Sequence, residues 1–231
     1  FAKKHNGCFI KSPWSSSGRG VVNASTLSER ELIRRAEGII KRQGSIMCEV
    51  SLDKRIDFAM LFYSDGTSVK QIGYSLFFTG NSTAYSGNIV TSDTLIEKYL
   101  STMISIEQLH NTSYALESVL TDIIVPRYTG FFGIDMLIYN ENGANKIAPC
   151  IEVNLRMTMG IVAWHLYQNH LAPNSEAVMR VEYGKDSFYE KEPIFEGKKL
   201  VEGSLSLIPP GTNFHITLDA KRGSKTLQFS I

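Results

Sequence analysis

Apolar positions recur at two periods along the chain. Alternating or β-rich apolar runs, bounded by turn residues, predict strands at residues 8–12, 46–50, 56–63, 69–78, 131–139 and 150–156. Apolar residues spaced three and four apart predict helices at 28–44, 93–103, 106–124 and 160–169. Because these elements follow no regular β-α-β order, the pattern favours the α+β class over a doubly wound sheet.

Local signals mark where some of these elements begin and end. Ser28, with Glu31 three positions later, forms a capping box at the start of the first helix, and Gly44 suits the end of that helix. Asn142-Gly143 indicates a tight turn, although the whole connection, 140–145, reads as a loop of more than two residues.

The composition is that of an ordinary globular protein: of 231 residues, 43% are hydrophobic and 20% are charged. The formal net charge is +1, so nothing overall calls for nucleic acid or an anionic membrane as a partner. No apolar run approaches the roughly 18 residues that a membrane helix requires, and no signal peptide leads the chain. We therefore expect a cytoplasmic protein.

Three cysteines, Cys8, Cys48 and Cys150, are too few and too scattered for a disulfide framework or a zinc site. Each lies in an apolar, strand-like stretch. We interpret them as small buried hydrophobic residues in a reducing compartment.

Metal-ligating side chains gather on one face of a predicted strand pair. Side chains alternate along a strand, so Glu152, Asn154 and Arg156 share one face, and a pairing that sets Asp135 opposite Glu152 adds a second carboxylate. Two carboxylates and an amide oxygen suit Mg²⁺ or Mn²⁺. The alternative is a hairpin with a solvated polar face, which is common in antiparallel sheets.

The segment 11–20, KSPWSSSGRG, is rich in small hydrogen-bond donors beside two cations. It lacks the P-loop pattern and the third glycine of a dinucleotide fingerprint. Its backbone N–H groups and serine hydroxyls, with Lys11, could still surround phosphate groups. The alternative is a turn that binds no ligand.

Four stretches together resemble the ATP-grasp superfamily, which includes D-alanine–D-alanine ligase and biotin carboxylase. They are FIKSPWSSSGRGV, MCEVSLDKRIDFAMLF, GFFGIDMLIY and CIEVNLRMTMG, and the similarity spans residues 8 to 163. The resemblance implies an α+β, ATP-grasp fold in which two subdomains hold ATP and Mg²⁺ or Mn²⁺ between antiparallel sheets.

The resemblance also implies a division of the chain. We expect a small subdomain at 1–65 with the glycine-rich loop and adenine hinge, and a large subdomain at 66–176 with the metal site. A β-rich extension of unassigned role follows at 177–231. The family usually has a preceding domain and an earlier ATP-contacting lysine. Since the chain begins at Phe1 without Met, we expect a fragment that is poor at catalysis alone.

Residue by residue, the resemblance implies the following ATP contacts. Lys11 resembles the lysine that touches ATP phosphate. The mobile loop over the phosphates corresponds to Ser15, Ser16, Ser17, Gly18, Arg19 and Gly20. The adenine hinge corresponds to Glu49, Val50 and Leu52. Asp57 is placed like the acid that binds the ribose hydroxyls, although the family more often has Glu there at a slightly different spacing.

The resemblance assigns the remaining site residues to metal binding and catalysis. Asp135, Glu152 and Asn154 match the metal ligands, and Arg156 matches the arginine of the E-x-N-x-R version of the motif. Arg156 would stabilise the transferring phosphoryl group or the tetrahedral intermediate.

The implied activity is an ATP-dependent ligase that converts a small carboxylate or amino-acid-like substrate to an acyl phosphate for attack by an amine or thiol. Two alternatives stay open: a nucleotide-binding module without turnover, and an ATP-dependent phosphotransferase. Tyr85, Asn88 and the segment 157–160 are candidate substrate contacts, because loops often carry specificity. His110 and His165 read as ordinary helix residues.

Overall fold

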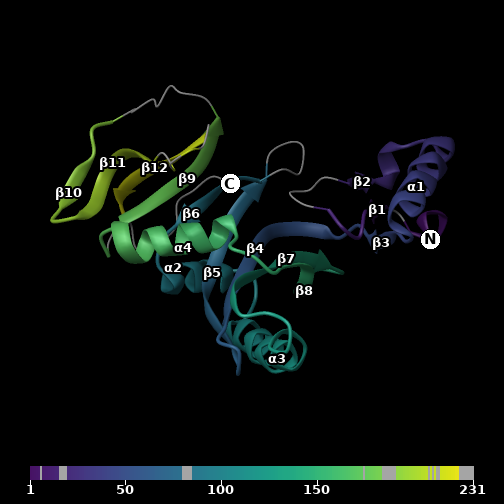
Figure 1. Cartoon of the computed structure of the whole chain (residues 1–231), viewed down its shortest axis with the longest axis horizontal. Coiled ribbons are helices and arrows are strands. Elements are labelled where there is room, and N and C mark those ends of the chain that lie inside the picture. Colours follow the sequence, from purple (N-terminus) through teal and green to yellow (C-terminus); the bar gives the residue numbers. More distant parts are fainter. Residues whose placement is uncertain are drawn as a thin grey trace. The chain divides into compact units, whose positions relative to one another are not determined.

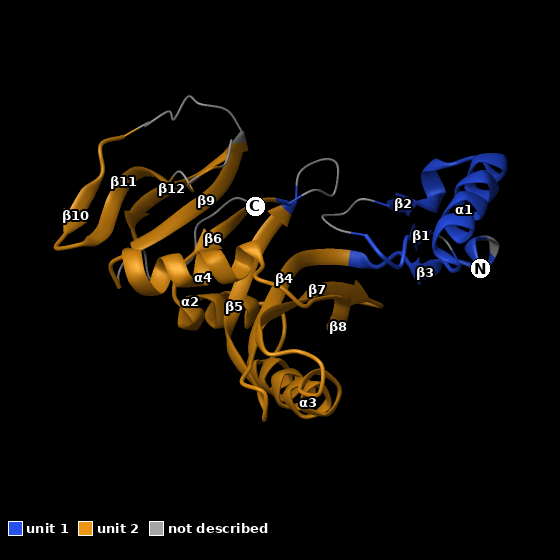
Figure 2. Ribbon diagram, viewed as in Figure 1, with its two compact units in different colours: residues 1–53, 79–85 blue, residues 54–78, 86–231 orange. Residues whose placement is uncertain are grey.

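The computed structural model describes residues 1–5, 7–15, 20–79, 85–173, 175–183, 191–207, 209, 211 and 214–223. The chain forms two compact units, one of residues 1–53 with 79–85 and one of residues 54–78 with 86–231 (Figure 2). The strand that begins at Asp53 belongs to the larger, nine-stranded sheet, and all but its first residue lies in the second unit. The strands beyond residue 177 join that same sheet.

The first unit is a small three-stranded antiparallel sheet with one long helix. The order of its strands is β2-β1-β3. Its elements are η1 (Ala2–Lys4), β1 (Cys8–Lys11), β2 (Val21–Asn23), η2 (Ala24–Thr26), α1 (Glu29–Gln43) and β3 (Met47–Val50). Cys8 and Ile10 of β1 and Ile39 of α1 are buried.

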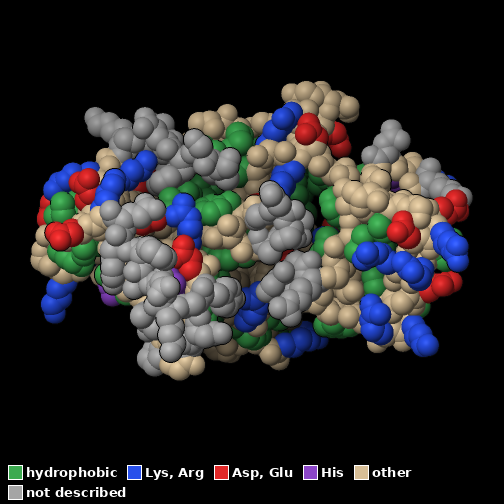
Figure 3. All heavy atoms as spheres, turned by 90° about the horizontal axis from the view of Figure 1, so that it is seen from above, with side chains coloured by type: hydrophobic (Ala, Val, Ile, Leu, Met, Phe, Trp, Pro, Cys, Tyr) green, Lys and Arg blue, Asp and Glu red, His purple; other side chains and the backbone are tan. Residues whose placement is uncertain are grey.

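Helix α1 begins and ends as its sequence predicts. The Ser28 hydroxyl accepts from the Glu31 N–H, and the Glu31 carboxylate accepts from the Ser28 N–H, which completes the capping box. Gly44 ends the helix with φ of 77°, a conformation that glycine adopts without strain. Lysine and arginine side chains gather around this helix (Figure 3).

The second unit is a nine-stranded sheet flanked by three helices (Figure 1). Its strand order is β10-β11-β12-β9-β6-β5-β4-β7-β8. The strands are β4 (Asp53–Ser64), β5 (Val69–Thr79), β6 (Tyr85–Val90), β7 (Gly130–Glu141), β8 (Ala144–Asn154), β9 (Ser175–Tyr183), β10 (Ile194–Glu196), β11 (Lys199–Leu207) and β12 (Phe214–Arg222). The helices are α2 (Asp93–Leu100), α3 (Ile106–Ile124) and α4 (Met159–His170). The expected α+β class is confirmed.

Alternation along the strands places a separate apolar layer on each face of this sheet. One layer packs against α2 and α3; its members include Phe58, Met60, Phe62, Phe132, Ile134, Leu100, Leu109 and Leu120. The other packs against α4; its members include Ala59, Leu61, Ile161 and Trp164. Burying each large side chain stabilises the fold by roughly 1.5–3 kcal/mol.

The β7–β8 hairpin corrects the expectation of a long loop. Its turn has only two residues, Asn142 and Gly143, with φ of 54° and 85°. Both values are positive, as a type I′ turn requires. The extra residues lie instead in a bulge of β8, because Asp135 is opposite Glu152 whereas Leu137 is opposite Ala148. Since β8 is an edge strand, it tolerates this irregularity.

The cysteines behave differently from one another. Cys8 is buried as expected, but Cys48 and Cys150 are exposed, so the interpretation of all three as buried residues was wrong for two of them. Both exposed cysteines lie on edge strands, β3 and β8.

None of the described helices is long and apolar enough to cross a bilayer.

Candidate nucleotide and metal site

The predicted carboxylate pair lies side by side on β7 and β8. Asp135 is opposite Glu152 and Gly133 is opposite Asn154, in the register that side-chain alternation predicts. The Asn154 side-chain amide donates to Asp135 Oδ2 at 3.1 Å, and Arg156 Nη2 donates to Asn154 Oδ1 at 3.0 Å. A continuous hydrogen-bonded chain therefore joins Asp135, Asn154 and Arg156.

Negative charge is concentrated around Asp135. Burial raises the pKa of Asp135 to about 7, and the carboxylates of Glu152 and Asp57 act in the same direction. The hydrogen bond from Asn154 and the positive charge of Arg156 oppose this rise. The ionised form is therefore disfavoured unless a cation binds nearby.

Asp57 belongs to this electrostatic environment. It lies on β4, the neighbour of β7, and forms an ion pair with Lys54 at 2.5 Å. The family resemblance places it at the ribose hydroxyls, yet its charge acts on the Asp135 carboxyl. Alternation with buried Phe58 indicates that Asp57 points away from the α2–α3 core. No local pattern in the sequence indicates that β4 lies beside β7.

The donor set is chemically suited to a hard divalent cation. Asp135 and Glu152 provide carboxylate oxygens and Asn154 an amide oxygen, and a cation would relieve the repulsion among the acids. The described residues contain no group of three or more His, Cys, Asp or Glu side chains arranged to hold a metal ion. The candidate site therefore depends on Asn154, whose oxygen now accepts from Arg156.

The N-terminus of α4 lies beside Gly133 of β7, two residues from Asp135. Thr158 caps this helix by accepting from the Ile161 N–H at 3.3 Å. An added Cβ at Gly133 would lie 3.3 Å from the Thr158 methyl carbon, so β7 passes close to the helix start. A helix N-terminus carries partial positive charge, which favours a bound anion.

The candidate substrate contacts differ in how deeply they are buried. Asn88 is fully buried, and its amide donates to Ser75 Oγ at 2.5 Å and to the Leu76 carbonyl at 3.0 Å, so its role is structural. Gly160 also packs tightly, since an added Cβ would lie 2.6 Å from Ser75 Oγ. Tyr85 is half-buried, which raises the pKa of its hydroxyl. Met157 is exposed.

In the first unit, two residues that the resemblance assigns to ATP form an ion pair. Lys11 Nζ lies 2.5 Å from Glu49 Oε2, across the β1–β3 pair. Lys11 is thus held on the sheet by a partner that the sequence did not reveal. Beyond this pair, Val50 is exposed and Leu52 is half-buried.

The glycine-rich segment is described only at its ends. The Ser15 hydroxyl donates to the Ser12 carbonyl at 3.3 Å, and the Ser12 N–H donates to the Gly20 carbonyl at 3.0 Å. Gly20 has φ of 79°, and an added Cβ would lie 2.7 Å from Ser12 Oγ, so this position requires glycine. Ser16, Ser17, Gly18 and Arg19 lie outside the described residues.

The two histidines lie in helices, as expected. His110 of α3 is bonded to Glu97 of α2 at 3.2 Å. His165 of α4 packs edge-on against Phe131, with ring centroids 5.3 Å apart.

Comparison with known proteins identifies the architecture. No protein-family model and no curated protein sequence matches this chain. Among solved structures, the biotin carboxylase domain of Hydrogenobacter thermophilus 2-oxoglutarate carboxylase matches 96% of this chain with a TM-score of 0.60 at 14% identity. Biotin carboxylase of Campylobacter jejuni matches 97% of it, with a TM-score of 0.56 at 11% identity.

These structural neighbours are ATP-grasp proteins. The chain has an ATP-grasp fold. Rhizobium etli pyruvate carboxylase matches it similarly, over 96% of this chain with a TM-score of 0.57 at 13% identity. The ATP-grasp likeness thus extends into the tail beyond residue 177, which the sequence motifs did not cover. This chain spans 54%, 56% and 22% of the three matched chains, in the order given.

Proposed function

We propose that this chain is the nucleotide-binding portion of an ATP- and Mg²⁺-dependent ligase that activates a carboxylate for attack by an amine or thiol. The observation that carries the proposal is the group formed by Asp135, Glu152, Asn154 and Arg156 on an ATP-grasp fold. The biotin carboxylase domain of Hydrogenobacter thermophilus was crystallised with MgADP, ADP and bicarbonate, so a related fold binds both a nucleotide and a small acid.

Each proposed residue has a role that its chemistry can fill. Asp135, Glu152 and Asn154 would hold Mg²⁺, which offsets charge on the phosphates when bound. Arg156 would donate hydrogen bonds to the transferring phosphoryl group. Lys11 would neutralise phosphate charge after release from Glu49.

The remaining nucleotide contacts follow the family resemblance. Backbone groups of Glu49, Val50 and Leu52 would read the adenine edge. The loop formed by Ser15, Ser16, Ser17, Gly18, Arg19 and Gly20 would cover the phosphates. Asp57 is the proposed ribose ligand, but its effect on Asp135 supports a position close to the metal instead.

In the proposed reaction, a carboxylate oxygen attacks the γ-phosphorus and the bond to the departing ADP breaks. The resulting acyl phosphate is then attacked at carbon by the amine or thiol, and phosphate leaves. The proposed substrate is a small carboxylate or an amino-acid-like molecule.

One observation favours a second candidate, a nucleotide-binding module without turnover. Lys11 pairs with Glu49, so in this structure its positive charge is neutralised by a carboxylate instead of a phosphate. Turnover of ATP by the full chain separates the two candidates.

Hydroxylamine trapping tests the proposal. The chain is incubated with ATP, Mg²⁺ and a panel of small carboxylates and amino acids, and hydroxylamine converts any acyl phosphate to a stable hydroxamate. A ligase yields ADP and hydroxamate in equal amounts. Formation of ADP and a phosphorylated alcohol, with no hydroxamate, indicates a phosphotransferase. Binding of the nucleotide with no formation of ADP indicates the non-catalytic module.

A further inference from the structure

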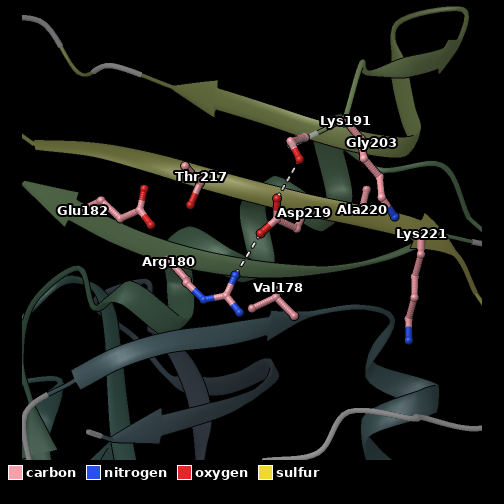
Figure 4. Close-up of a pocket in the computed structure, with 10 residues that line it drawn as sticks. Val178, Arg180, Glu182, Lys191, Gly203, Thr217, Asp219, Ala220 and Lys221 are labelled. Carbon is pink, nitrogen blue, oxygen red and sulfur yellow. Dashed lines mark hydrogen bonds and ion pairs between the residues drawn. The ribbon is translucent and has the colours of Figure 1, made fainter. Parts of the chain in front are cut away.

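A polar hollow of about 620 Å³ lies over strands β9, β11 and β12 (Figure 4). Arg180 and Glu182 of β9, Thr217 and Asp219 of β12, and Lys191 contribute side chains to its wall. The hollow takes no part in the function proposed above. The sheet face on which it lies, the polar residues at its floor and the pairing of its charged side chains indicate what it could bind.

The candidate metal site occupies the sheet face that carries α4. Asp135 and Gly133 are two residues apart on β7 and therefore point to the same face. Gly133 is in close contact with Thr158 at the start of α4. Ligands of the proposed reaction would therefore bind on the α4 side of the sheet.

Arg180 points to the opposite face. In the β6–β9 pair, Gly87 is opposite Arg180, and Asn88 is the next residue on β6. Asn88 bonds to Ser75, whose hydroxyl lies against Gly160 of α4, so Asn88 faces α4. Gly87 and Arg180 consequently face away from α4, and the hollow is separate from the carboxylate pair.

The floor of the hollow is built from buried polar groups. Ser204 is 5% exposed and Thr217 is 7% exposed, although both line the hollow. Ser204 Oγ donates to Asp219 Oδ1 at 2.8 Å, and Asp219 Oδ2 pairs with Arg180 Nη1 at 2.8 Å. Figure 4 shows this chain, which ties the Arg180 guanidinium to Asp219 in the wall of the hollow.

Lys191 is held at the wall by a close backbone approach. Its carbonyl accepts from the Ser204 N–H at 3.0 Å. Gly203 has φ of 98°, and an added Cβ would lie 2.2 Å from the Glu192 carbonyl oxygen. Only glycine permits this approach, which fixes the backbone at Lys191 beside the hollow.

The cations of the hollow differ in whether a carboxylate neutralises them. Asp219 neutralises Arg180, and Glu182 is bonded to the buried His215 at 3.0 Å. Lys221 interacts with Glu176, which is opposite it in the β9–β12 pair. Among the described residues, no acidic side chain forms an ion pair with Lys191.

We propose that this hollow binds a small anionic metabolite through a carboxylate or phosphate group. The anion would contact Lys191 and the fixed guanidinium of Arg180, and the Thr217 hydroxyl would hydrogen-bond to a neighbouring polar atom. Such a ligand is distinct from ATP and from the activated carboxylate, since it binds on the other face of the sheet.

Calorimetric titration of the full chain with inorganic phosphate and, separately, with succinate tests the proposal. Lys191→Gln removes the proposed contact, and Lys198→Gln removes the same charge from the exposed β10–β11 turn. Lys191→Gln should weaken binding roughly tenfold, as expected for a lost charge-assisted hydrogen bond. Lys198→Gln should leave it unchanged. Preference for one probe identifies the group that the hollow recognises.

Three results would overturn the proposal. In the first, neither phosphate nor succinate binds at millimolar concentration. In the second, Lys191→Gln and Lys198→Gln weaken binding equally, which indicates general charge attraction. In the third, Lys11→Ala abolishes binding while Lys191→Gln does not, which assigns the anion to the glycine-rich loop. Because Lys191 is exposed, its variant is expected to fold normally, and a circular dichroism spectrum checks this.

Discussion

Replacing Asp135 by asparagine should stabilise the protein and at the same time abolish Mg²⁺-dependent nucleotide binding. The carboxyl lies between Glu152 and Asp57 in a largely buried position, and its pKa rises from 3.8 to about 7. A rise of this size corresponds to roughly 4 kcal/mol of disfavoured ionisation. Water and side-chain adjustment relieve part of it. The expected gain in the free energy of unfolding is therefore about 2 kcal/mol.

The sign of the effect depends on pH. Because the pKa of Asp135 is higher in the folded than in the unfolded protein, the wild type loses stability as pH rises from 3.8 towards 7. Asp135→Asn carries no ionisable group there, so its advantage should be absent below pH 3.8 and complete above pH 7.

Urea denaturation in the presence of a metal chelator, repeated across this pH range, measures the effect. Asp122→Asn on the exposed side of α3 makes the same chemical change without burial and is the matched control. Equal or lower stability of Asp135→Asn above pH 7 would show that ionisation of Asp135 does not destabilise the folded protein. Unchanged Mg²⁺-dependent affinity for ATP would refute the assignment of Asp135 as a metal ligand.

Three further predictions concern single side chains. Lys11→Ala should weaken binding of ATP more than of adenosine, because the proposed partner is phosphate; equal losses in calorimetry would place Lys11 elsewhere. Phe62→Ala should cost about 3–5 kcal/mol of unfolding free energy, since the ring is fully buried, and the loss should exceed that of its exposed neighbour in Tyr63→Ala. Asp65→Asn should lower the urea midpoint above pH 3.8. That difference should shrink as pH falls towards 2, because hydrogen bonds from Thr67 and Ser68 hold the pKa of Asp65 at about 2; a constant difference would contradict this.

Local physics made much of the fold predictable from the sequence. Ser28, Glu31 and Gly44 define α1 through interactions within a few residues. Alternation along β7 and β8 predicts that Asp135 and Glu152 share a face, and the register of the hairpin confirms that they are opposite each other. The bulge in β8 could not be predicted from the sequence. Proline usually interrupts a strand, so Pro149 makes β8 look shorter and its connection to β7 look longer than they are.

Features that depend on pairing between distant segments could not be predicted from the sequence. The influence of Asp57 on Asp135 requires that β4 lie beside β7, which no local pattern specifies. The Lys11–Glu49 pair depends on the register between β1 and β3. Asn88 looked like a loop residue because its buried partner, Ser75, is thirteen positions away. The roles of Lys11, Glu49 and Asp57 in ATP binding stay predictions.

Calorimetric titration of the chain with a non-hydrolysable ATP analogue, with and without Mg²⁺, tests directly whether Asp135, Glu152 and Asn154 hold a metal ion that helps to bind the nucleotide. Binding should strengthen when Mg²⁺ is added, and this dependence should be lost in the double variant that combines Asp135→Asn with Glu152→Gln. Equal affinity in the presence and absence of Mg²⁺, or a double variant that behaves like the wild type, would contradict this assignment.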